Sequence, residues 1–204
     1  NLGAIELNLG NKKEALTLLI NATNSDPKLD AAWGNLSNIY LKTGKIKEAE
    51  QSCIKALNLN PKNVYYLNQL ISIFIAQKKY IEAEESLREL ILLKSDFVDA
   101  YFRLGLILIR LGKPKEAEEY LLETIKLKPE YVLAHFNLGK IYSNLERKNE
   151  AEKSFRKAVE LKNDFHEAYC NLGVILLDLG KQKEAESTLR KSIQINPNHS
   201  LSYY

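Results

Sequence analysis

The hydrophobic residues of this chain recur at the spacing of one face of an α-helix. In AWGNLSNIYLK, residues 32–42, the apolar face consists of Trp33, Leu36, Ser37 and Tyr40. A second amphipathic run, KEAEQSCIKAL, follows at 47–57, with charged residues on its outer face. Gly44 separates the two runs and Pro61 follows the second, so the stretch predicts a hairpin of two helices.

This hairpin pattern returns every 34 residues along the chain. Large side chains recur at Trp33, Leu67, Tyr101, His135, Tyr169 and Tyr203. Three places later comes an unbroken leucine series at Leu2, Leu36, Leu70, Leu104, Leu138 and Leu172. The next place is mostly small, with Gly3, Ser37, Ile71, Gly105, Gly139 and Gly173. A second unbroken series consists of Ala15, Ala49, Ala83, Ala117, Ala151 and Ala185.

The small residues predict how the hairpins pack. A large side chain at the Gly/Ser or Ala positions would push the two helices of a hairpin apart, so we expect close helix contacts there. One hairpin cannot bury its apolar face alone, and neighbouring hairpins are therefore expected to stack on one another.

The same series resembles the tetratricopeptide repeat (TPR), most closely at Trp33, Leu36, Tyr40, Ala49, Ala56 and Pro61. The resemblance implies an all-α fold, a right-handed superhelix (α-solenoid) of 34-residue helix-turn-helix units. We expect a single array over 1–204, cut from a longer one. Its parts are a partial repeat at 1–29, full repeats at 30–63, 64–97, 98–131, 132–165 and 166–199, and the start of a further repeat at 200–204. The 64–97 unit matches least well, and we expect it to keep its hairpin with looser turns.

The resemblance also implies that the first helix of each unit lines a concave groove. In the 30–63 unit the groove stripe is Ala31, Asn35, Asn38 and Lys42. The Asn35 position reads Asn35, Gln69, Arg103, Asn137 and Asn171 in successive units. Side-chain amides both donate and accept hydrogen bonds, so such a ladder suits the main chain of an extended peptide. The long TPR superhelices attached to O-linked N-acetylglucosamine transferases are similar in carrying an asparagine ladder, although Arg103 interrupts it here. The alternative interpretation is an ordinary solvated helix surface.

Further along this stripe the centre is basic and the C-terminal end is acidic. A ligand with an acidic group and an apolar anchor would suit the basic centre, beside which Phe102 and Phe136 lie. For these two rings, packing between repeats is the favoured alternative. We therefore predict a peptide- or partner-binding surface made of Asn35, Asn38, Lys42, Gln69, Arg103, Arg110, Asn137, Lys140, Asn144 and Asn171. The carboxylate clamp of chaperone-binding TPR domains is not expected, because Ala31 and Asp99 stand where its lysines would be.

Charge and composition argue against two classes of partner, nucleic acids and membranes. A net charge of +3, from 29 basic and 26 acidic residues, is too balanced for a generic nucleic-acid binder. The longest apolar run, residues 104–112, falls short of the ~20 residues that span a bilayer. We therefore expect no nucleic-acid and no membrane partner. Two distant cysteines suit a reducing compartment and favour the cytoplasm.

We find no spacing typical of a catalytic or metal site in the sequence, so we expect no cofactor and no enzymatic activity within 1–204. His135 occupies the packed large-residue position, and Cys53 occupies a core position as an inert thiol. Cys170 lies nearer the groove. The KEAE segments at 47–50, 115–118 and 183–186 read as a convex-face charge pattern with i,i+4 support.

These observations favour a protein-interaction scaffold that binds a peptide or partner protein in its groove. The chief alternative is the substrate-recruiting arm of a larger enzyme, such as a glycosyltransferase, whose catalytic domain lies outside 1–204. RNA binding of the pentatricopeptide type is disfavoured by the strict 34-residue period and the near-neutral charge. End-to-end self-association through exposed terminal units, including SLSYY at 200–204, is a further possibility.

Overall fold

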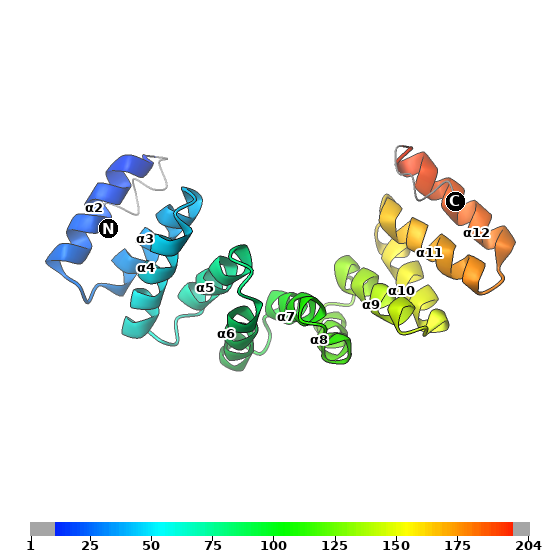
Figure 1. The fold of residues 1–204 in the computed structure, drawn as a ribbon, viewed down its shortest axis with the longest axis horizontal. Coiled ribbons are helices and arrows are strands. Elements are labelled where there is room, and N and C mark those ends of the chain that lie inside the picture. Colours follow the sequence, from blue (N-terminus) through cyan, green and yellow to red (C-terminus); the bar gives the residue numbers. More distant parts are fainter. Residues whose placement is uncertain (1–10, 198–204) are drawn as a thin grey trace. The chain divides into compact units, whose positions relative to one another are not determined.

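The computed structural model describes residues 11–197, and every regular element there is an α-helix. The helices are α2 (Lys12–Ser25), α3 (Asp30–Lys42), α4 (Ile46–Leu59), α5 (Val64–Ala76), α6 (Tyr80–Leu93), α7 (Val98–Arg110), α8 (Pro114–Leu127), α9 (Val132–Asn144), α10 (Lys148–Leu161), α11 (His166–Asp178) and α12 (Gln182–Ile195) (Figure 1). The all-α repeat fold expected from the sequence is thus confirmed. The expectations for residues 1–10 and for SLSYY lie outside the described residues.

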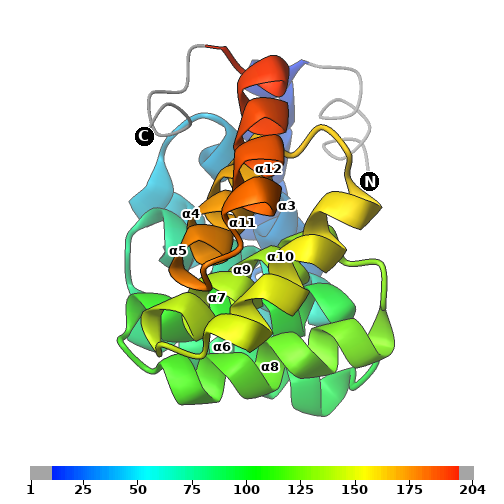
Figure 2. The same ribbon diagram turned by 90° about the vertical axis from the view of Figure 1, so that its right-hand side faces the viewer.

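The chain divides into two compact units, one up to Ala100 and one from Tyr101 on. Within the first unit, α2 packs on α3, α3 on α4, α4 on α5 and α5 on α6. Within the second unit, α8 packs on α9, α9 on α10, α10 on α11 and α11 on α12. Figures 1 and 2 both show α11 and α12 side by side as one hairpin. Each unit is therefore a stack of hairpins.

The small residues sit where the helices of a hairpin touch. The alanine series is completely buried from Ala15 to Ala185. A Cβ atom added to Gly139 on α9 would lie 2.6 Å from Cε1 of Phe155 on α10. The corresponding distance from Gly105 to Leu121 Cδ2 is 2.9 Å. The predicted close approach of the two helices is confirmed, because these sites have no room for a further carbon.

The turns within the hairpins share one backbone conformation, in which the middle residue is left-handed. Gly44, Gly112 and Gly180 have φ values of 76°, 72° and 73°. Lys78 and Glu146 take the same conformation, at φ 60° and 57°. In the 64–97 unit, the amide of Lys79 donates to the carbonyl of Phe74 at 2.9 Å, as that of Lys45 does to Tyr40. The expectation of looser turns in this unit is wrong, because the same hydrogen bonds close the turn even without glycine.

The 64–97 unit differs from its neighbours in the packing of its first helix, where a large side chain replaces a small one and faces a glycine. Tyr66 on α5 stands where the neighbouring units carry alanine, and it is buried. Gly34 on α3 makes room for it, since a Cβ atom there would collide with the Tyr66 ring. The Tyr66 hydroxyl donates to Asp30 Oδ2 at 3.3 Å. A large residue in one hairpin is thus matched by a small one in the next.

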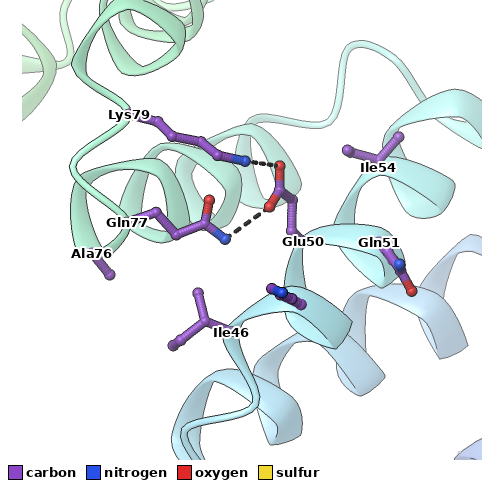
Figure 3. A pocket seen from close by; sticks show the side chains of 8 residues that line it. Ile46, Glu50, Gln51, Ile54, Ala76, Gln77 and Lys79 are labelled. Atoms are coloured by element: carbon purple, nitrogen blue, oxygen red, sulfur yellow. Dashed lines mark hydrogen bonds and ion pairs between the residues drawn. The ribbon is translucent and has the colours of Figure 1, made fainter.

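The KEAE segments join neighbouring hairpins, which the sequence analysis did not predict. Figure 3 shows Lys79 and Gln77, which follow α5, reaching Glu50 on α4. Both contacts measure 2.7 Å. The same positions pair in the second unit, with Arg147 to Glu118 and Lys181 to Glu152, also at 2.7 Å. Among the KEAE segments, the expected i,i+4 pair appears at Glu186 and Arg190.

Candidate functional site

A hollow of about 640 Å³ lies between α9 and α11, the first helices of two successive repeats in the second unit. Its lining residues are Leu133, Phe136, Lys140, Phe165, Glu167, Cys170, Asn171 and Val174. The Phe136 and Phe165 rings, with centroids 4.7 Å apart, pack against each other in its wall. Leu133 and Val174 leave 46% and 49% of their surface exposed. The hollow therefore offers an apolar interior that is open to a ligand.

The two helices that line this hollow carry opposite charges, a lysine on α9 and a glutamate on α11. Lys140 of α9 holds its ammonium 5.7 Å from the centre of the Phe136 ring, within cation–π range. Glu167 of α11 is exposed and begins the opposite side. A ligand lying across α9 and α11 would meet a cation on one helix and a carboxylate on the other.

Two of the ten predicted site residues, Lys140 and Asn171, line the hollow. Asn171 donates its side-chain N–H to the backbone carbonyl of Glu167 at 2.7 Å. Asn137 makes the same bond to the carbonyl of Leu133, also at 2.7 Å. Each amide is thereby held against its own helix, and its oxygen and second N–H are left for a ligand.

In the first unit, the groove stripe brings Asn38 of α3 and Gln69 of α5 to one phenol. Gln69 Nε2 donates to the Tyr65 hydroxyl at 3.1 Å, and Asn38 Nδ2 approaches the same oxygen at 3.4 Å. Tyr65 is 51% exposed, and the Gln69 amide oxygen is buried with no hydrogen-bond partner. The sequence analysis missed Tyr65, although it stands one turn before Gln69 on the predicted stripe.

The other predicted residues are spread along the same helices. Asn35 is half-buried on α3, and Arg103 is half-buried on α7. Exposed side chains at the C-terminal ends of α3, α7 and α9 are Lys42, Arg110 and Asn144. Neither the two arginines nor Asn144 lines the hollow. The predicted basic centre therefore contributes one residue, Lys140, to this cavity.

The two phenylalanines of the predicted aromatic wall have different roles. Phe102 is buried against Tyr131, with ring centroids 4.7 Å apart, so it packs between repeats. Phe136 packs on Phe155 and Phe165 and also lines the hollow. The packing interpretation is confirmed for both rings, and Phe136 in addition offers a face to a ligand.

His135 and Cys53 have structural roles, whereas Cys170 lines the hollow. His135 Nε2 lies 2.8 Å from the carbonyl of Pro129, as Trp33 Nε1 lies 2.9 Å from that of Pro27. The half-buried histidine therefore takes the place of the indole. Burial raises the pKa of the Cys53 thiol to about 11, and this thiol donates to the carbonyl of Tyr66.

The sequence analysis did not predict the apolar lining from Leu133, Phe165 and Val174. Leu133 stands one turn before Asn137, and Val174 lies three residues after Asn171, so both extend the groove stripe. Phe165 immediately precedes α11. A search for exposed apolar residues on the stripe could have found the first two.

Family models described as tetratricopeptide repeat match residues 30–63, 98–131, 132–165 and 166–199. These segments cover more than half of the chain. The chain belongs to the tetratricopeptide repeat family. TPR units are protein-interaction modules, and a general role in protein interaction follows from this membership. The 64–97 unit, with its Tyr66 and Lys78 substitutions, is not among the matched segments.

Solved structures with the same fold share little sequence with this TPR protein. YrrB, described as a TPR protein with an unusual peptide-binding site, is 23% identical, with a TM-score of 0.77 over 91% of this chain and 95% of its own. PilF of Pseudomonas aeruginosa is 20% identical, with a TM-score of 0.77 over 99% and 92%. MamA is 23% identical, with a TM-score of 0.77 over 82% and 92%. No curated protein sequence matches the chain.

None of the helices between residues 11 and 197 is both long enough and apolar enough to cross a membrane. In the same part of the chain, no three or more His, Cys, Asp or Glu side chains cluster as metal ligands would.

Proposed function

We propose that this TPR protein binds an extended segment of a partner protein, and that the hollow between α9 and α11 takes an apolar side chain of that segment. The observation that supports this most directly is the exposed apolar lining, with Leu133 and Val174 at its rim. Burying one large apolar side chain contributes about 1.5–3 kcal/mol, which is enough to dominate the recognition of a short segment.

Polar groups beside the hollow would orient the segment. The free oxygen and second N–H of Asn137 and Asn171 suit the alternating donors and acceptors of a peptide main chain. Lys140 would favour an acidic residue close to the anchor, and Glu167 a basic one on the α11 side. The alternative role, as a substrate-recruiting arm of a larger enzyme, would use the same surface.

The proposal is tested by changing the charge of the hollow without touching the core. A random peptide library is panned on the chain, and the affinity of an enriched peptide is measured by fluorescence anisotropy. Val174→Lys places a charged side chain at the rim of the hollow, whereas Leu177→Lys changes a similarly exposed residue of α11 that does not line it. We expect Val174→Lys to weaken binding by at least about tenfold, equivalent to ~1.4 kcal/mol.

Leu177→Lys is the matched control and should bind as the unmodified chain does. A second variant, with Asn137 and Asn171 both changed to alanine, tests the amide contribution while leaving the apolar lining in place. Equal weakening by the two lysine variants would contradict the assignment of the hollow. Unchanged binding in the asparagine variant would show that these amides are ordinary helix surface.

A further inference from the structure

The first unit carries a second recognition point on α3 and α5, centred on the Tyr65 hydroxyl. The oxygen of this hydroxyl accepts hydrogen bonds from Gln69 Nε2 at 3.1 Å and from Asn38 Nδ2 at 3.4 Å. A phenol oxygen has two lone pairs and one proton. Because two amides occupy the acceptor side, the proton remains to be donated. Tyr65 is 51% exposed, so it can be donated to a ligand.

The surroundings of Tyr65 strengthen it as a donor. A hydroxyl that accepts hydrogen bonds is polarised and becomes a better donor in turn. Lys42 is exposed and lies one helical turn beyond Asn38 on the same face of α3. The groove stripe itself carries Ala31, Asn35, Asn38 and Lys42 on α3, and Tyr65, Gln69 and Ser72 on α5, with no carboxylate. Lys42 is therefore the one charged side chain on this stripe. The Asp30 carboxylate beside the stripe already accepts from the Tyr66 hydroxyl.

We infer that the Tyr65 hydroxyl binds a carboxylate oxygen of an acidic side chain in the partner segment. Asn38 and Gln69 act as positioning residues. This inference rests on the proposed function and adds a preferred residue to it. A charge-assisted O–H···O⁻ bond is shorter and stronger than one to a neutral carbonyl. Such a bond favours an aspartate or glutamate over the corresponding amide. The Tyr65 ring packs edge-on against the buried Tyr66 ring, with centroids 5.8 Å apart, and this contact helps to position the hydroxyl.

Among the full repeats, the 64–97 unit alone supplies a hydroxyl at this position. The positions equivalent to Tyr65 in the other units are occupied by Ala31, Asp99, Leu133 and Glu167, none of which carries a hydroxyl. The interaction would thus fix one register of an acidic segment along the repeats. An apolar residue at the hollow and an acidic residue at Tyr65 are two separate requirements.

The experiment is a double-mutant cycle on the intact chain. Peptides of about 16 residues, long enough at ~3.3 Å per residue to cross several hairpins, are selected from a random library. Each Asp or Glu of an enriched peptide is then replaced by Asn or Gln. Binding of both forms is measured with the unmodified chain and with Tyr65→Phe, which removes only the hydroxyl. Tyr80→Phe, a half-buried tyrosine of α6 in the same unit, is the matched control.

We expect one acidic position whose neutralisation weakens binding about tenfold with the unmodified chain and Tyr80→Phe, and far less with Tyr65→Phe. Equal losses with all three proteins would overturn the carboxylate site. A Tyr65→Phe loss that is the same for acidic and neutral peptides would assign the hydroxyl to a main-chain carbonyl and overturn it as well. If Val174→Lys abolishes binding and Tyr65→Phe does not, the hollow stands and the Tyr65 site falls. If no peptide binds the unmodified chain, both fall.

Discussion

Gly139 tests the packing argument most directly, because alanine at this position has to displace a buried ring. The added Cβ would lie 2.6, 2.7 and 2.9 Å from three atoms of the Phe155 ring. Ordinary carbon–carbon contacts lie at about 3.5–4.0 Å, so the ring or the helix has to move by roughly 1 Å. Phe155 is completely buried, and its ring also packs against Phe136 of α9, with centroids 5.9 Å apart.

The expected loss follows from two opposing terms. Overpacking of a rigid core costs about 1–3 kcal/mol, and three ring atoms below 3 Å place Gly139→Ala near the upper end. Alanine is a better helix former than glycine by about 1 kcal/mol, which offsets part of this cost. The free energy of unfolding should therefore fall by about 2 kcal/mol.

Urea unfolding followed by far-ultraviolet circular dichroism measures this loss. With a slope of about 2 kcal/mol per molar urea, the midpoint should fall by roughly 1 M. Repeat proteins can unfold in parts, so the slopes of the variants have to agree before the midpoints are compared. Asn137→Ala is the matched control on the same helix. Its free energy of unfolding should change by less than about 0.5 kcal/mol.

A second substitution shows whether the ring is the cause. The 64–97 unit pairs Ile71 with Leu87 at the corresponding positions, and both are completely buried. Leucine faces a larger neighbour in that hairpin, although Leu121 leaves no room for a Cβ at Gly105. Phe155→Leu should therefore rescue Gly139→Ala only in part. A stability of Gly139→Ala equal to that of the unmodified chain would refute the reasoning. So would purely additive losses in the double variant.

Three further predictions concern the turns, the inter-repeat ion pairs and the cysteines. Lys78→Gly should raise the free energy of unfolding by about 1 kcal/mol, since a non-glycine residue is strained at φ 60°, and a lower urea midpoint would contradict this. Partial burial alone would raise the pKa of the Glu152 carboxyl, but hydrogen bonds from Lys181 and a neighbouring arginine hold it below its ordinary value of 4.5. A carboxyl whose pKa is lowered by folding stabilises the protein at pH values above its unfolded-state pKa, and this stabilisation is lost as the pH falls through its folded-state pKa. The urea midpoint of the unmodified chain should therefore fall in acid. In Glu152→Gln this fall should be smaller. Iodoacetamide should modify Cys170, which lines the hollow, before Cys53, whose pKa is about 11, and mass spectrometry of digested protein gives the order.

The fold was predictable because its period lies in residues that pack. Leu36 to Leu172 and Ala15 to Ala185 recur without a gap, and each residue that the structure describes in these series is buried. The tight turn at Lys78 could not be predicted, because the sequence shows only that the glycine of most other turns is missing there. The backbone hydrogen bonds that hold the left-handed residue in place become visible only in the structure.

The candidate site was predictable only in part. Stepping along the stripe found Lys140 and Asn171, because helix geometry alone places them on the groove side. It did not find Phe165, which precedes α11 and follows no helical period. The KEAE pattern placed Glu50 among charges of the convex face, whereas its ion pair with Lys79 of the next hairpin depends on how the repeats stack.

Both proposed recognition points include a repeat position whose residue differs from unit to unit. The position one turn before the amide stripe reads Ala31, Tyr65, Asp99, Leu133 and Glu167, five residue types in five units. The leucine and alanine series do not vary because each member fills a space that the neighbouring helix leaves. The five side chains at the position one turn before the amide stripe are partly or largely exposed, so packing constrains them less and they can be fitted to a ligand. Tyr65 and Leu133 then differ because the first would bind an acidic residue and the second would line a hollow for an apolar one. On this proposal, the variable stripe would carry recognition, on a scaffold that the invariant leucine and alanine series hold constant.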